Sequence, residues 1–448
     1  MSGEEGDSPS CRDAATCARN VKLMLALQAL QGMLFSVAMG PVFDKYLYFI
    51  GGGRNSIVGV TQSVNGLTSL VMAIPVGLIV DWFATRRAFL LRVCSVTGVI
   101  ATGVGVVAVL SDQLWMLYVT LVLYGIFMEL SSSASEAIFA DSTPVGRRTE
   151  IFTRKAIVST LSAAVGPFMT AVGFIAIGDD WKLASEHVVI ITGFVLTLPV
   201  CAVLWFFADP PAAEAADAET TQGSGAGPSA NKCLFLKRKH IPYVVASSDF
   251  ICCIGAGMTI KFLSLFFVND LKFTASQVNL LAAAYPVSIA LSMKVLEKAT
   301  KPLGRAQASC LFFSCNIAGF AGLAKLHSVP LLVVVHLLRG SFANSTAPID
   351  RSIVMDFTPS SQRGRWNAVE SLNSVTWSGS AFVGGLLSDS HDYRFTFLVT
   401  AGIYAVAMVV YAPLLWLVPR RERDAAGLLA ADGTPGDASN ISMADISG

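Results

Sequence analysis

The sequence is short of charge. Only 14% of its 448 residues are Asp, Glu, Lys or Arg, whereas a globular domain carries about 25%. The formal net charge is +1, which excludes a global field that would attract nucleic acid. Because 53% of the residues are hydrophobic and lie in many apolar runs, the shortage of charge indicates a polytopic membrane protein that contacts the lipid bilayer and no nucleic acid.

Motifs for metal binding and catalysis are also absent. The nine cysteines have neither metal-ligand spacing nor the pattern of a disulfide framework, so we expect them to pack as small buried hydrophobes. The sequence has no nucleotide-binding loop, no H-E-x-x-H and no long soluble domain. These absences predict neither an enzyme nor a cofactor or metal. The first twenty residues do not resemble a signal peptide, so we expect the first apolar segment to remain as a membrane helix.

Twelve segments have the roughly 20 mainly apolar residues that a membrane-spanning helix needs. The prediction is therefore an all-α polytopic membrane protein with twelve transmembrane helices. The segments lie near residues 21–40, 57–80, 88–110, 114–139, 151–177, 187–207, 241–268, 275–296, 306–323, 329–354, 366–387 and 395–418. The first could run past Pro41 as a broken helix.

A polar segment divides the spans into two sets of six. It is rich in Ala, Glu, Thr, Gly and Ser, a composition that predicts a disordered linker. The expected organisation is a tail (1–20), a six-helix half (21–207), the linker (208–240), a second six-helix half (241–418) and a second tail (419–448).

Lysine and arginine predict the orientation. With the N-terminus in the cytoplasm, the cytoplasmic connections and tails hold 22 of the 32 Lys and Arg residues, the opposite side holds six, and four lie within spans. The positive-inside rule then places both termini in the cytoplasm.

The two halves are related in sequence. Asp141-Ser-Thr-Pro144 follows the fourth span, and Asp356-Phe-Thr-Pro359 follows the tenth, 215 residues later. A turn that recurs at equivalent ends of two six-span halves indicates an internal repeat. Repeated halves with a binding site between them are a recurrent transporter plan.

The connection between spans two and three carries a charged motif. Gly77 is followed four residues later by Asp81, and then by Arg86 and Arg87. This stretch resembles motif A of the major facilitator superfamily, although Ala84 replaces a common glycine and the basic pair comes about one residue late. The resemblance covers all twelve spans, the linker and both repeats. It implies the fold of that superfamily, in which spans one, four, seven and ten line a central cavity.

Polar residues are consistent with that cavity. An intramembrane charge costs at least about 2.5–3.5 kcal/mol on insertion scales, so it should face water or protein. The fourth, seventh and tenth spans hold Glu129, Asp249, Lys261 and Arg339, and their other charged residues lie near the cytoplasmic ends. The candidate cavity residues are Gln28, Gln31, Glu129, Asp249, Lys261, Arg339 and Asn344.

Two roles follow for these charges. Lys261 and Arg339 together would favour an anionic or carboxylated solute, because arginine binds a carboxylate through two parallel hydrogen bonds. The alternative is that Asp249 or Glu129 neutralises each cation. Glu129 and Asp249 are also candidates for proton coupling, whereas a structural hydrogen bond is the alternative for Glu129.

A second set of residues lies at the cytoplasmic ends of the spans. The resemblance implies that such groups pair with the motif A bases when the cytoplasmic side is closed. The glycine before the acid would let another helix approach. The candidate gate residues are Gly77, Asp81, Arg86, Arg87, Glu136, Asp141, Arg351 and Asp356.

We therefore expect a secondary active transporter that moves a small organic solute by alternating access, with an anionic solute and proton coupling as hypotheses. The alternative is a transporter-fold sensor or scaffold that binds a ligand without transport. The expected partners are the solute, protons and lipid, and the expected state is a monomer. Asp424-Ala-Ala-Gly-Leu428-Leu429 has the pattern of an acidic dileucine sorting signal, so both the plasma membrane and an endolysosomal or vacuolar membrane are candidate locations.

Overall fold

The computed structural model describes residues 9–83, 85–143, 148–209, 240–357 and 363–418. Residues 210–239 of the predicted linker, the predicted C-terminal tail, the proline of each D-x-T-P turn, and Ala84 lie outside this part of the chain. α1 already begins at Pro9, within the segment expected as a tail.

The described residues form a nearly all-helical structure. The N-terminal half contains α1 (Pro9–Ala38), α2 (Pro41–Ile50), α3 (Asn55–Trp82), α4 (Arg87–Leu110), α5 (Leu114–Asp141), α6 (Arg148–Ile177), α7 (Leu183–Val195) and α8 (Leu198–Trp205). The C-terminal half contains α9 (Ile241–Asn269), α10 (Ala275–Leu303), α11 (Arg305–Lys325), α12 (Val329–Ser345), α13 (Ala347–Asp356), α14 (Arg363–Ser390), α15 (Tyr393–Tyr411) and α16 (Leu414–Leu417).

These helices make twelve spans, which confirms the predicted fold class. Four spans consist of two consecutive helices: α1–α2, α7–α8, α12–α13 and α15–α16. Each break lies just before a proline, namely Pro41, Pro199, Pro348 and Pro413. Proline interrupts a helix because it lacks the N–H donor and its ring clashes with the preceding turn.

The two halves pack together through α3 against α14 and α6 against α10. Small residues allow close approach in the first of these contacts. A Cβ atom built on Gly66 would lie 1.9 Å from the Ser378 Cβ, and one on Gly59 would lie 2.4 Å from the Ala381 carbonyl oxygen. Glycine therefore brings the two helix backbones together.

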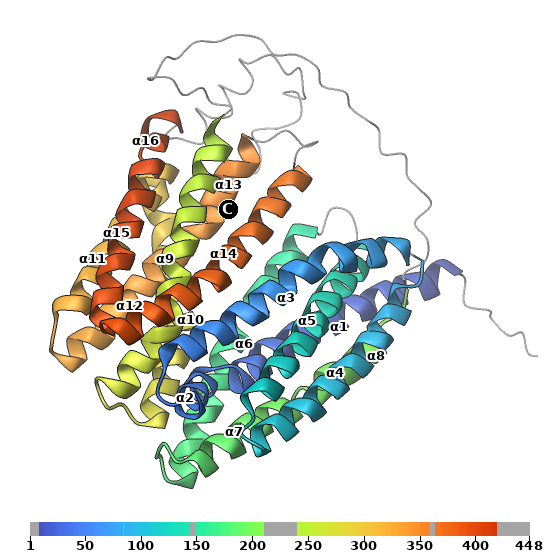
Figure 1. Cartoon of the computed structure of the whole chain (residues 1–448). Helices are drawn as coiled ribbons and strands as arrows, with labels where there is room; N and C mark the ends of the chain where they lie inside the picture. The colour runs from blue at the N-terminus through green and yellow to red at the C-terminus, as the bar shows by residue number, and fades with distance from the viewer. Residues whose placement is uncertain (1–8, 84, 144–147, 210–239, 358–362, 419–448) are drawn as a thin grey trace, which may run out of the picture.

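The bundle has two distinct ends. We call the end where α1 begins, α8 ends and α9 begins the terminal end, and the opposite end the distal end. The halves diverge toward the terminal end in Figure 1. At the distal end they are tied by hydrogen bonds, for example from Lys45 to Asn269 (2.9 Å) and from the Trp181 indole to the Phe273 carbonyl (2.9 Å).

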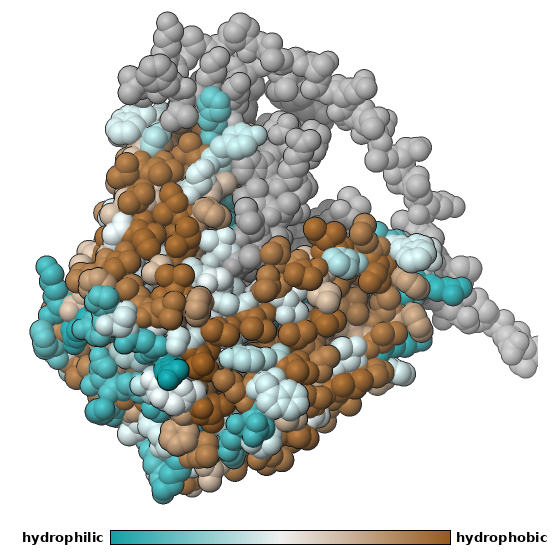
Figure 2. All heavy atoms as spheres, in the orientation of Figure 1, coloured by the Kyte–Doolittle hydropathy of each residue, from teal (hydrophilic) through white to brown (hydrophobic). Residues whose placement is uncertain are grey.

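The sides of the bundle are apolar. Figure 2 shows hydrophobic residues along the helices and hydrophilic residues gathered at the distal turns. Ten spans are long and apolar enough to cross a membrane by length and composition. The α12–α13 span and α14 fall outside this set: one is broken at Thr346, and the other is rich in Ser, Asn and Gly. The chain is an integral multi-pass membrane protein.

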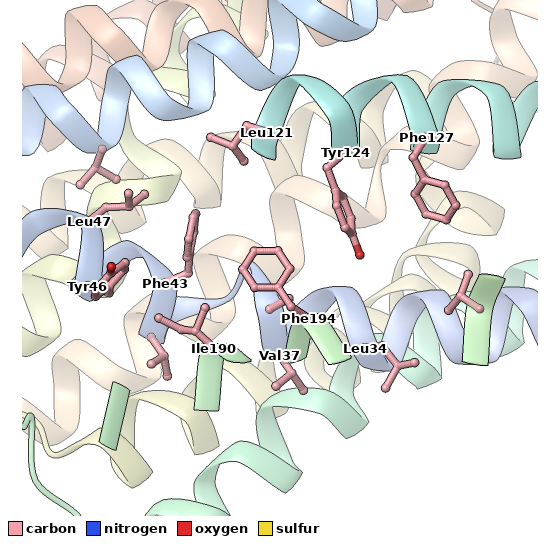
Figure 3. Close-up of a cluster of buried hydrophobic side chains, with 14 of the residues drawn as sticks. Leu34, Val37, Phe43, Tyr46, Leu47, Leu121, Tyr124, Phe127, Ile190 and Phe194 are labelled. Atoms are coloured by element: carbon pink, nitrogen blue, oxygen red, sulfur yellow. The ribbon is translucent and has the colours of Figure 1, made fainter. Parts of the chain in front are cut away.

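Aromatic side chains fill the N-terminal half where α1, α2, α5 and α7 meet (Figure 3). The Tyr124 ring lies 5.6 Å from that of Phe127 and 6.1 Å from that of Phe194, both edge-on. Edge-to-face pairs stabilise such a core beyond the area that they bury. This part of the interior is packed, which matters because a large cavity lies in the other half.

Candidate functional site

A cavity of about 590 Å³ lies in the C-terminal half, within the range of roughly 300–1,000 Å³ that is typical of small-molecule sites. Its walls come from α9 to α15. Apolar side chains such as Ile260, Phe313 and Met408 form much of the surface. The polar and charged lining consists of Ser248, Asp249, Tyr285, Ser309, Arg339, Asn344, Thr346, Asp350, Arg351, Asn373, Tyr404 and Tyr411.

Arg339 is the buried cation of this cavity. The residue is only 2% exposed. Its guanidinium carbon lies 4.3 Å from the centre of the Phe320 ring, a cation–π distance. A Cβ atom on Gly319 would lie 2.7 Å from the Arg339 Cβ, so the absence of a side chain there makes room for the arginine stem.

The Arg339 guanidinium is incompletely satisfied. Its Nε and Nη2 atoms are buried and have no hydrogen-bond partner among the described residues. Leaving a buried charge uncompensated is strongly destabilising. The cavity-lining Asn373 also has a buried side-chain oxygen without a partner in the described chain. These polar atoms, gathered around one cavity, mark it as a place that a polar ligand could complete.

Acidic residues line another part of the same cavity. Asp350 is 8% exposed and accepts a hydrogen bond from the Tyr411 hydroxyl at 2.6 Å. It follows Arg339 by eleven residues and lies on α13, beyond the break that separates it from α12. Asp249 also lines the cavity, from α9. The lining therefore combines the buried Arg339, the two acids, the exposed Arg351 next to Asp350, and apolar side chains.

Three of the predicted cavity residues, Asp249, Arg339 and Asn344, line this space. The Asn344 side-chain amide donates to the Tyr285 hydroxyl at 3.2 Å and to the Gly340 carbonyl at 2.8 Å. The structure therefore brings together residues from spans seven and ten, as the sequence suggested.

Lys261 lies elsewhere. Its Nζ is 3.3 Å from Asp44 Oδ1 on α2, in an ion pair between the two halves. The neutralising acid therefore differs from both acids that the sequence suggested, Asp249 and Glu129. Asp44 was missed, although an acid within the apolar stretch Pro41–Ile50 was a usable signal.

The remaining predicted cavity residues belong to the N-terminal half. The Gln31 side chain donates to the Ser131 hydroxyl at 3.4 Å, and the Gln28 carbonyl accepts from the Ser162 hydroxyl at 3.3 Å. Glu129 is partly buried, and no partner for it is found among the described residues. These three residues are not part of the C-terminal cavity lining.

Two ion pairs hold the terminal end of the N-terminal half. Arg87 pairs with Asp141, joining α4 to α5, and Lys155 pairs with Glu136, joining α6 to α5. Lys155 was not among the predicted gate residues. Both pairs lie within one half, so they organise that half in this conformation rather than bridging the two.

The other predicted gate residues have varied surroundings. Asp81 and Arg86 are exposed, and a Cβ atom on Gly77 would meet nothing within 4 Å among the described parts of the chain. Arg351 lines the C-terminal cavity. The side chain of Asp356 lies outside the described part of the structure. The described residues contain no cluster of three His, Cys, Asp or Glu side chains suited to a metal ion.

Solved transporters share this architecture. A bacterial homologue of the human lysosomal transporter Spinster, in an inward-facing and occupied conformation, aligns over 96% of this chain and 100% of its own, with a TM-score of 0.66 and 13% identity. The nucleoside transporter NupG aligns over 88% of this chain and 98% of its own, with a TM-score of 0.63 and 14% identity. At these identities the likeness concerns the fold.

Sequence comparisons identify the family. The MFS-type transporter tstD of Talaromyces stipitatus is 26% identical over 147 residues, which cover 32% of this chain and 26% of the relative. The MFS-type transporter clz19 of Cochliobolus lunatus is 29% identical over 145 residues, covering 32% and 28%. The matches thus span about a quarter of the length of these relatives. The family model named Major Facilitator Superfamily matches residues 21–248 and 245–440. The family consists of transporters rather than enzymes, and this chain, with its twelve spans in two halves, is a member of the Major Facilitator Superfamily.

Proposed function

We propose that this protein moves a small organic anion across a membrane by alternating access, and that the anion binds in the C-terminal cavity. The observation that carries the proposal is Arg339, a buried cation in the cavity wall whose Nε and Nη2 have no described partner. These two nitrogens form one edge of the guanidinium, with parallel N–H groups that match the two oxygens of a carboxylate.

The solute would meet one buried cation, Arg339, because Arg351, the other cation of the lining, is exposed. Lys261 is already paired with Asp44 at 3.3 Å, so it adds little net positive charge to the site. The apolar walls and the Tyr285 and Tyr404 rings would accommodate a carbon skeleton. An amphipathic monoanion therefore fits the cavity better than a small, highly charged one.

The conformation of the structure would let the solute bind or leave from one side of the membrane. The hydrogen bonds between the halves gather at the distal end, and the open space around Gly77 lies toward the terminal end. If the terminal end is cytoplasmic, as the distribution of Lys and Arg predicts, this is the inward-facing state. Rocking of the halves would then expose the site to the other side.

Proton coupling is a further part of the proposal, with Glu129 as the first candidate. A partly buried intramembrane carboxyl without a described partner is a functional candidate by default. Asp249 is the second candidate, since it lies in the cavity wall. Under this proposal, Glu129→Gln abolishes the dependence of transport on a pH gradient and leaves solute exchange intact.

Binding is tested with purified protein and a panel of carboxylates, phosphates, neutral solutes and amines, read by thermal shift. We expect organic carboxylates to stabilise the protein. Arg339→Gln should weaken that binding about 10- to 100-fold, because a hydrogen bond to a charged group contributes about 1.5–3 kcal/mol. Arg339→Lys should recover part of the loss. The matched control is Lys325→Gln, an exposed cation in the same half.

Transport is tested with the same solutes in liposomes, with and without a pH gradient. Uptake that Arg339→Gln abolishes supports the proposal. Binding without flux in the wild-type protein would favour the alternative, a sensor or scaffold. Preference for neutral or cationic solutes, unchanged in Arg339→Gln, would overturn the assignment of the anion site.

A further inference from the structure

Two aspartates at the distal end each cross from one half to a helix start in the other half. Asp179, in the turn after α6, accepts hydrogen bonds from the Ser276 backbone N–H and hydroxyl, both at 2.7 Å. Asp389, near the end of α14, accepts from the backbone N–H groups of Asn55 at 2.6 Å and Ser56 at 2.8 Å. Ser276 is the second residue of α10, and Asn55 and Ser56 are the first two of α3.

The two contacts are equivalent under the internal repeat. α6 and α14 are the fifth spans of their halves, and α3 and α10 are the second spans. Each aspartate thus joins the end of a fifth span to the start of the second span of the opposite half. These helix pairs are also the ones that pack side by side across the boundary. Because the same contact occurs at both symmetric positions, we expect it to stabilise the packing of one half against the other.

Helix starts favour a carboxylate at these positions. The first turn of a helix has backbone N–H groups without an intrahelical partner and carries partial positive charge. α3 has no capping side chain of its own, since Arg54 at its N-cap makes no such hydrogen bond. Asp389 supplies the missing cap from the other half.

The backbone around Asp179 is shaped for its contact. Asp179 has φ +46° and follows Gly178 at φ +121°. The left-handed region is costly for a residue with a side chain, so the turn is held there by its surroundings. The hydrogen bonds to Ser276 are part of what holds it.

Other polar contacts share the interface. Lys45 of α2 donates to Asn269, whose amide donates to the Tyr393 hydroxyl at 2.9 Å, and that hydroxyl donates to the Asn55 side chain at 2.7 Å. This chain runs from one half to the other and back, and it ends on the residue that Asp389 caps. The start of α3 is therefore bound to the C-terminal half by two contacts, one from Asp389 and one from Tyr393.

We propose that Asp179 and Asp389 are a pair of symmetric latches that close the distal end and set the equilibrium between the two states of the transport cycle. The inference rests on the proposed alternating access. Each latch is formed when the distal ends of the halves meet and is exchanged for water when they part. Both aspartates are positioning residues, since neither contacts the cavity.

The experiment measures the distance between labels on the two halves, in the full chain in lipid nanodiscs. Labels introduced through unnatural amino acids at Gln113 and His327, in exposed turns of opposite halves at the distal end, avoid the native cysteines. A second pair at the terminal end reports the reciprocal movement. The variants are Asp179→Asn, Asp389→Asn and the double change.

We expect each single variant to raise the ratio of distal-open to distal-closed protein about two- to fivefold, the typical range for a carboxylate at a helix start, and the double variant to raise it further. Terminal distances should shorten in parallel. Asp179→Glu and Asp389→Glu, which keep the charge, should lie closer to wild type. Misfolding of an asparagine variant would instead broaden the distance distributions at both ends of the bundle. In that case the glutamate variants, which keep the charge, provide the test of the latch.

Two matched controls use neighbouring carboxylates. Asp180 pairs with Lys182 within its own turn, and Asp392 caps Phe395 within its own half. Asp180→Asn and Asp392→Asn should leave the ratio unchanged. An unchanged ratio in the latch variants, or an equal change in the controls, would overturn the inference. Because the distances require no solute, a failure of the latches can be told apart from a failure to observe transport.

Discussion

Arg339 depends on a neighbour without a side chain. Gly319 lies against the arginine stem: an added Cβ would come within 2.7 Å of the Arg339 Cβ and 2.9 Å of its Cγ. Both are atoms close to the backbone, which cannot swing aside as the end of a flexible side chain can. The position of the guanidinium is thus fixed by a neighbouring helix as well as by its own.

Gly319→Ala should therefore displace Arg339 and weaken binding of an organic carboxylate about tenfold, since overpacking of this kind costs about 1–3 kcal/mol. Gly322→Ala, on the same helix, is the control, because its Cβ would meet Val335 at an ordinary 3.4 Å. Isothermal titration of both variants checks the prediction. Equal affinities would show that Arg339 is not held from this side.

Two of the glycines of α3 have unlike surroundings. Gly66 lies against Ser378 of α14, whereas Gly77, about three turns further along, has no neighbour within 4 Å among the described side chains. Among the described residues, the helix thus contacts the other half at Gly66 and not at Gly77. If the terminal ends approach in the opposite state, the free end of α3 must acquire a partner.

Gly77→Leu should leave solute affinity in this state unchanged and slow transport at least about tenfold, because the added volume would obstruct closure at a cost of roughly 1–3 kcal/mol. Gly103→Leu is the control, since Gly103 also has no neighbour within 4 Å but lies on α4. Liposome flux together with equilibrium binding separates the two effects. Unimpaired flux in Gly77→Leu would contradict a role in closure.

At the scale of the whole molecule, the carboxylate of Asp179 helps to hold the distal ends of the two halves together. Burial raises the pKa of Asp179, but the hydrogen bonds with Ser276 and Thr274 together lower it by more, so the net shift is downward from 3.8. A carboxyl with a depressed pKa stabilises the closed end fully above its ordinary pKa and loses that contribution as the pH falls through the depressed value.

We therefore expect Asp179 to stabilise the closed distal end equally at pH 7 and pH 5. This stabilisation should be lost only below about pH 4. In Asp179→Asn this acid-dependent opening should disappear. The labels at Gln113 and His327 measure it. Opening of the wild-type protein near pH 6 that persists in Asp179→Asn would assign the titration to another group.

Much of this architecture could be predicted from the sequence. Apolar runs of sufficient length locate the spans, because a membrane helix must satisfy its own backbone, and the repeated D-x-T-P turns reveal the halves. The predicted ends shift by several residues, for instance at Leu183, where α7 begins before the expected His187. The family, the fold class and the character of an integral multi-pass membrane protein are confirmed.

The contacts within that architecture could not be predicted. Asp44 and Lys261 are 217 residues apart, and Asp389 and Asn55 are 334 apart, so no local pattern relates them. A charged residue in a span indicates that it needs a partner, but the choice of partner is made by helix packing. For the same reason, the sequence placed polar residues of both halves in one cavity, whereas the described cavity belongs to one.

That confinement has a consequence for energetics. Every described residue that lines the cavity lies between Val245 and Tyr411, in the C-terminal half. A solute bound there would keep its contacts with the C-terminal half while the N-terminal half moves relative to both. Its contacts, and hence its affinity, would be nearly the same from either side of the membrane. Uphill accumulation would then require coupling to a second gradient, for which Glu129, outside the cavity, is the first candidate and Asp249, in its wall, is the second.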